Sequence, residues 1–91
     1  MRSVEPYRVP FLFDRSRAPL YRLVNVGPES LRGVTLTLVG AGMMPANEPT
    51  ALGPSEALEV TIRGDHLERA SAVVVRWLRP SGEDYLWRAT F

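Results

Sequence analysis

The sequence predicts an all-β protein, an antiparallel sandwich of about seven short strands. Apolar and polar residues alternate along several runs, which is the period-two pattern of strands with one buried face. Glycine, proline or asparagine bounds these runs, whereas helical periodicity is nearly absent. Turns that recur about every eight to twelve residues favour two packed sheets or a small barrel over parallel crossovers.

Six runs have clear strand character, and 31–39, where three apolar side chains alternate with two threonines, is the clearest. Pro10 lacks a backbone N–H, so the first run is expected at a sheet edge or at a break between sheets. A single helical turn is expected to start at Asp65, which forms a variant capping box with Glu68. The expected strands are 7–14, 20–26, 31–39, 57–63, 72–79 and 85–91.

Two connections are informative. Residues 40–55 contain repeated glycine and proline and are expected to form a long connection with room for one short strand. The segment 80–84 has turn chemistry throughout, so the last two strands should form a hairpin. The segment 1–18 is expected to be an edge strand or an arm.

Composition limits what the chain can be. Its 91 residues suffice for one domain, 1–91, which can bury about 60 to 65% of its unfolded surface. There is no cysteine, and the eleven basic side chains, all arginine, nearly balance ten acidic ones. No run is apolar enough for a signal peptide or a membrane helix. We therefore expect a cytoplasmic protein with no membrane partner.

Most catalytic chemistry is excluded by missing residues. The absence of cysteine removes thiolate metal sites, and His66 is the only imidazole, so no histidine cluster can form. The absence of lysine removes a P-loop and a Schiff base, and no Gly-x-Ser-x-Gly elbow is present. We expect no enzyme activity, no cofactor and no metal site.

Two short motifs resemble a known family. The segment 25–27, Asn-Val-Gly, and the segment 52–54, Leu-Gly-Pro, are similar to turns of the bacterial immunoglobulin-like modules called CARDB and of their fibronectin-type-III-like relatives. The resemblance covers residues 20–91. It implies an immunoglobulin-like antiparallel β-sandwich of about seven strands for adhesion, spacing or partner binding, without catalytic residues. Those modules have Pro-Gly where this chain has Gly53-Pro54, which changes the residue that can adopt positive φ.

The last hairpin also supports an alternative, a small β-barrel that binds single-stranded nucleic acid. Such barrels stack bases on aromatic rings flanked by arginines. If Val73, Val75 and Trp77 share a face with Trp87 and Phe91, however, these rings form the core and cannot stack on bases. Nucleic acid is therefore the less favoured partner. The interleaved residues are Arg76, Trp77, Arg79, Tyr85, Trp87 and Arg88.

The length of the hairpin loop sets which residues are opposite. A loop of three or five residues places Trp77 opposite Trp87 and Arg76 opposite Arg88, where like charges repel. A loop of four residues instead places Arg76 over Trp87, a cation–π geometry.

The hairpin has apolar residues on both faces, which an antiparallel sheet with one solvated face should not have. The predicted partner-binding residues are Val74, Arg76, Leu78, Leu86 and Arg88. We expect them to contact another protein or a second copy of this chain; alternatively, segment 7–13 covers them within the monomer. The expected function is a non-catalytic protein–protein interaction or structural accessory module, and self-association is one form of it. No small-molecule ligand is predicted.

Overall fold

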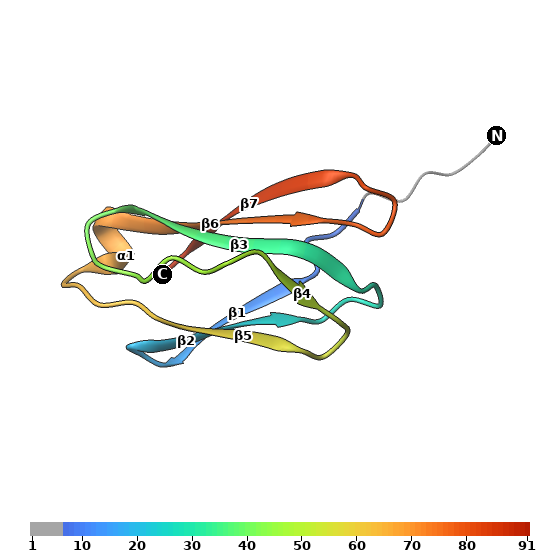
Figure 1. The fold of residues 1–91 in the computed structure, drawn as a ribbon. Coiled ribbons are helices and arrows are strands. Elements are labelled where there is room, and N and C mark those ends of the chain that lie inside the picture. The colour runs from blue at the N-terminus through green and yellow to red at the C-terminus, as the bar shows by residue number, and fades with distance from the viewer. Residues whose placement is uncertain (1–6) are drawn as a thin grey trace.

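The computed structural model describes residues 7–91 as two antiparallel sheets packed face to face (Figure 1). The first sheet has the order β1 (Phe11–Arg17), β2 (Leu20–Asn25), β5 (Ala57–Thr61). The second has the order β4 (Thr50–Leu52), β3 (Leu31–Gly40), β6 (Ser71–Leu78), β7 (Asp84–Thr90). One helical turn, α1 (Leu67–Ala70), precedes β6. The predicted all-β sandwich of about seven strands is confirmed.

The order of strands leaves four strands at sheet edges. The chain crosses from one sheet to the other after β2, after β4 and after β5, so neighbours in sequence are often in different layers. Strands β1 and β5 are the edges of the first sheet, and β4 and β7 are the edges of the second. Figure 1 shows β3, β6 and β7 as one layer above β1, β2 and β5. The long connection after β3 contains the short strand β4, as expected.

The core lies between the two sheets and takes one face of every long strand. Along β3, Val34 and Leu36 are buried while Thr37 is exposed, which confirms the predicted alternation. Phe11 of the first sheet meets Trp77 of the second edge to face, with ring centroids 5.0 Å apart. The largest fully buried side chains are Trp77, Leu23, Leu31, Ile62, Val34, Val73, Val75 and Asn25.

Asn25 is a buried polar residue that joins three segments. Its Nδ2 donates to the carbonyls of Glu29, at 2.8 Å, and of Leu52, at 3.0 Å. Its Oδ1 accepts from the N–H of Gly27, at 3.0 Å. The Asn-x-Gly motif therefore closes β2 and ties the following turn to β4, which is a structural role.

The turn before β5 places positive φ at a residue other than glycine. Gly53 and Glu56 close it with a backbone hydrogen bond of 3.1 Å, and Pro54 occupies its second position. Ser55, in the third position, has a φ of 70°. This is the arrangement of a type II turn, which normally selects glycine there. The strained position of this turn is therefore Ser55.

The bounds of β1 and the start of α1 differ from those expected from the sequence. The first strand begins at Phe11, directly after Pro10, and continues to Arg17 because its pairing with β2 extends to Leu20. The predicted capping box is wrong: His66, with a φ of 56° and no side-chain cap, precedes the helix. Burial of Leu67 fixes the start of this turn, so Asp65 stays outside it.

The predicted pairings of the hairpin are wrong by two residues. Trp77 is opposite Tyr85, Arg76 is opposite Leu86, and Val74 is opposite Arg88. The loop runs over residues 79–83, and Arg79 N–H donates to the Glu83 carbonyl at 2.9 Å. Since β6 ends one residue earlier and β7 begins one residue earlier than expected, the register shifts while each residue keeps its face.

The part of the chain that the structure describes contains no helix with the length and apolar character to span a bilayer.

Candidate functional site

The five residues predicted to bind a partner all lie on the outer face of the β4-β3-β6-β7 sheet. Arg76 and Leu86 face each other, as do Val74 and Arg88. Leu78 is opposite Asp84, which shares the same face. The inner face of the hairpin carries Trp77 and its neighbours in the core. We call the outer group Val74, Arg76, Leu78, Asp84, Leu86 and Arg88 the hairpin face.

Exposure differs strongly within the hairpin face. Leu86 is 68% exposed, whereas Leu78 and Val74 are half-buried. A Cβ added at Gly33 would lie 3.4 Å from Leu78 Cδ1, so this leucine packs over the glycine. Leu86 is therefore the apolar side chain of the hairpin face that is most accessible to a partner, and Leu78 mainly supports the sheet.

Strand β3 extends the surface beyond the predicted residues. Thr37 is opposite Val74, and Val39, which is 44% exposed, is opposite Ala72. Sequence reasoning missed Val39 because no local signal shows that β3 pairs with β6. The alternation of the 31–39 run could have indicated it, because Val39 falls on the same face as the outward threonines.

The segment 7–13 does not cover the hairpin face, so that alternative is wrong. Tyr7 approaches the inner side of the hairpin, where its hydroxyl accepts a hydrogen bond from Trp77 Nε1 at 3.0 Å. Phe11 and Phe13 are buried between the sheets. These aromatic side chains point into the core, which leaves the opposite side of the four-stranded sheet open among residues 7–91.

The charges of the hairpin face lie on β6 and β7. Arg76 binds the Asp84 carboxylate with two nitrogens, and its Nε lies 3.0 Å from Oδ1. This hydrogen bond holds the pKa of Asp84 below its usual range and raises the pKa of Arg76. Within the described chain Arg88 makes no ion pair and is exposed.

Within residues 7–91, the outer edge of β7 offers backbone groups without a partner next to this face. Because Arg79 N–H donates to the Glu83 carbonyl, alternate residues of β7 from 83 onward bond to β6. The residues between them, Asp84, Leu86 and Arg88, direct their N–H and C=O groups away from β6. Farther along, Arg15 Nε donates to the Thr90 carbonyl at 2.8 Å, so this end of the edge is occupied.

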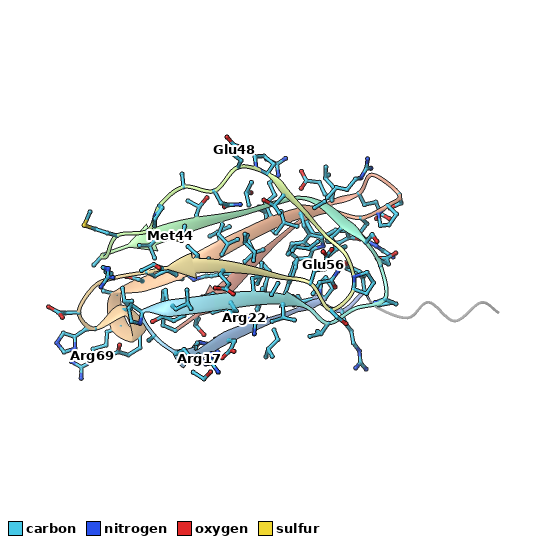
Figure 2. All side chains as sticks on the ribbon, turned by 60° about the horizontal axis from the view of Figure 1, so that its bottom comes forward. Arg17, Arg22, Met44, Glu48, Glu56 and Arg69 are labelled. Atoms are coloured by element: carbon cyan, nitrogen blue, oxygen red, sulfur yellow. The ribbon has the colours of Figure 1, made fainter. Side chains whose placement is uncertain are left out.

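A second surface is an apolar groove of about 690 Å³ at the opposite edge of the sandwich. The loop after β3 forms one wall, and Asn47 holds that loop by accepting from Leu36 N–H at 2.9 Å. Met43 and Arg63 close one end through paired backbone hydrogen bonds. Figure 2 shows Met44 near this opening. Arg63 is the one charged side chain among the described residues that line the groove.

Within 7–91, no group of three histidine or acidic side chains could hold a metal ion. His66 is largely exposed, and its Nδ1 lies 3.8 Å from a Glu68 carboxylate oxygen. This geometry is that of a solvated surface pair.

Comparisons with protein-family models, with curated proteins and with solved structures gave no match for this chain.

Proposed function

We propose that this protein is a non-catalytic interaction module that self-associates through the hairpin face. The observation that carries the proposal is the position of Leu86, which is 68% exposed on the outer face of the edge strand β7. Val74 on β6 is its diagonal neighbour on that face, and Val39 on β3 is in turn diagonal to Val74, so apolar side chains follow a diagonal across three strands. Exposed apolar surface framed by charged groups is typical of protein–protein contacts.

The charges favour a second copy of this chain over a partner of one charge sign. The hairpin face holds Asp84 as well as Arg76 and Arg88, so both signs occur within one small area. A patch that matches a basic or an acidic partner would carry mainly the opposite sign. A mixed patch can match itself when two copies are related by a two-fold axis.

The architecture supports a scaffold role of the immunoglobulin-like kind. In constant-type immunoglobulin domains the first, second and fifth strands share one sheet, and the third, sixth and seventh share the other. Here β1, β2 and β5 form one sheet, and β3, β6 and β7 belong to the other. The short strand β4 joins the second sheet instead of the first. Such sandwiches commonly present partner-binding surfaces on a rigid frame.

The nucleic-acid alternative is less well supported. It needs aromatic rings offered to bases, yet Trp77 is buried and both Tyr85 and Trp87 are half-buried on the inner face. Tyr85 packs against Tyr7, with ring centroids 4.6 Å apart. These rings contact other side chains of the protein. The aromatic residues of the hairpin, which suggested base stacking, therefore favour a role in the core.

Sedimentation equilibrium over a concentration series tests the proposal. The unmodified protein should self-associate, and Leu86→Asp should weaken the association at least about tenfold because a charge would be buried at the contact. Leu12→Asp is the matched control, since Leu12 is 55% exposed on the outer face of the other sheet. A purely monomeric unmodified protein at about 1 mM would contradict the proposal.

A further inference from the structure

We infer that two copies associate edge to edge, with β7 of one copy antiparallel to β7 of the other and the two-fold axis at Leu86. This inference rests on the proposed self-association and specifies how it occurs. The resulting sheet would run continuously through both copies.

The first argument is the direction of backbone groups. Strand β7 is an edge of its sheet, and Asp84, Leu86 and Arg88 point their N–H and C=O groups outward. Unpaired edges of this kind are templates for another strand. A two-fold axis at Leu86 makes these three residues hydrogen-bonded pairs with their counterparts, which gives about six inter-chain backbone hydrogen bonds.

The second argument is the symmetry of the side chains about Leu86. Asp84 precedes it by two residues and Arg88 follows it by two, and all three share the hairpin face. In the antiparallel pairing Asp84 of each copy is therefore opposite Arg88 of the other, and Leu86 is opposite Leu86. Opposite charges directly across a strand pair are favourable.

Charges at sheet edges often prevent association, but they do so when copies place like charges together. Here the pairing gives each Arg88, which has no ion-pair partner within the described chain, a carboxylate from the other copy. Asp84 would then lie between Arg76 of its own chain and Arg88 of the second copy. The charge pattern thus selects this register over neighbouring ones, which would bring Asp84 or Arg88 opposite an apolar residue.

The described residues around β7 leave this stretch accessible. Arg15 occupies the Thr90 carbonyl beyond the proposed contact, and Tyr7 lies on the inner side of Tyr85. Five residues of β7 from each copy form the proposed contact, which is far fewer than the number in the interface of a stable dimer of standard size. We therefore expect a weak dimer, with a dissociation constant between about 10 µM and 1 mM.

Charge reversal in mixed samples tests the register. Arg88→Asp alone and Asp84→Arg alone should each weaken self-association at least about tenfold, because like charges would face each other. An equimolar mixture of the two variants should form a dimer within about threefold of the original affinity, since every facing pair is again opposite in sign. Circular dichroism should show that each variant is folded. Adding Arg76→Asp to Asp84→Arg gives a second control, because it restores the ion pair within the chain with the two charges exchanged.

Hydrogen exchange separates this inference from the proposed function. Edge pairing should slow exchange of the Leu86 and Arg88 amides at high concentration relative to low concentration. The dimer could lose affinity in Leu86→Asp and yet show neither recovery in the mixed variants nor slowed amide exchange. In that case the two copies pack face to face: the edge pairing is wrong, and the proposed self-association stands. A monomeric unmodified protein overturns both.

Discussion

Trp77 donates its indole N–H to the hydroxyl of Tyr7 at 3.0 Å, although the two residues are far apart in sequence. The indole is buried on the inner face of β6, and Tyr7 lies in the segment before β1. The guanidinium of Arg79 lies over the Tyr7 ring, 4.1 Å from its centroid, while two of its nitrogens bind Glu29. This cluster fastens the N-terminal segment to the end of the hairpin and to the turn before β3.

Tyr7→Phe should therefore destabilise the fold by about 1 to 2 kcal/mol, because the buried indole N–H would lose its acceptor. Urea unfolding followed by tryptophan fluorescence measures this change. Tyr21→Phe is the control, since Tyr21 is a buried tyrosine that stacks on Phe13, but its hydroxyl makes no hydrogen bond within residues 7–91. Equal losses in both variants would show that the ring environment, and not the hydrogen bond, matters.

The same tyrosine should make stability sensitive to alkaline pH. Burial raises the pKa of Tyr7 above its ordinary value of 10.0, although the hydrogen bond from Trp77 and the charge of Arg79 act in the opposite direction. A raised pKa means that the folded state favours the neutral phenol. The associated stability is fully present below pH 10 and is lost as pH rises through the folded pKa. Tyr7→Phe should thus lose less stability than the original protein above about pH 10, in unfolding measured at constant ionic strength.

The hairpin shows which features sequence could predict. Which residues share a face follows from period two and survives a register shift of two, so the five predicted residues do share one face. Asp84, expected in the loop, joins that face because β7 begins one residue earlier. The register itself depends on where β6 ends. Arg79 leaves the strand to bind Glu29 and Tyr7, and no local pattern reports those distant partners. For the same reason sequence alone could not decide whether segment 7–13 covers the hairpin face or fills the core.

In the turns, too, the sequence predicts the position of the turn but not its tertiary contacts or backbone angles. The Asn-x-Gly motif marked the end of β2, but its hydrogen bond to Leu52 depends on how β4 approaches from elsewhere in the chain. Proline in the Gly53-Pro54 sequence signalled a turn, whereas the positive φ of Ser55 required the geometry. The free edge of β7 likewise follows from strand order, which no single-strand pattern contains.

Asn25→Ala should cost about 3 kcal/mol, because it leaves the Leu52 and Glu29 carbonyls and the Gly27 N–H without their partner in a buried site. Asn47→Ala is a revealing comparison. Asn47 also makes three side-chain hydrogen bonds, but at a half-buried position that water can reach. Asn47→Ala should lower the free energy of unfolding, measured by chemical denaturation, by about 1 kcal/mol. A similar loss for both would mean that burial does not set the penalty.

Ser55→Gly should stabilise the protein by about 0.5 to 1 kcal/mol. The backbone at Ser55 has a φ of 70°, and glycine adopts this conformation without the strain that a Cβ imposes. The gain is partly offset by the larger conformational entropy of glycine in the unfolded chain. Ser55→Ala keeps the Cβ and should leave thermal stability nearly unchanged. If alanine stabilises as much as glycine, the serine hydroxyl and not the backbone conformation is the cause.

Acid should weaken the hairpin through Asp84. Its pKa is held below the ordinary value of 3.8, first by the hydrogen bond from Arg76 and also by the charge of that arginine, against partial desolvation. A lowered pKa means that the folded state favours the carboxylate. The stability that it contributes is therefore present above about pH 4 and is lost as pH falls through the folded pKa. Unfolding of dilute, monomeric protein between about pH 2 and 5 measures this slope.

Asp84→Asn and Arg76→Gln should each flatten that acid dependence, and the double variant should flatten it no further, because both remove the same ion pair. The edge-paired dimer adds a second consequence. Since Asp84 would also face Arg88 of the other copy, protonation should weaken the dimer as well, so dissociation on acidification should be reduced in Asp84→Asn. Additive effects of the two substitutions in dilute protein would show that Asp84 draws its acid sensitivity from a partner other than Arg76.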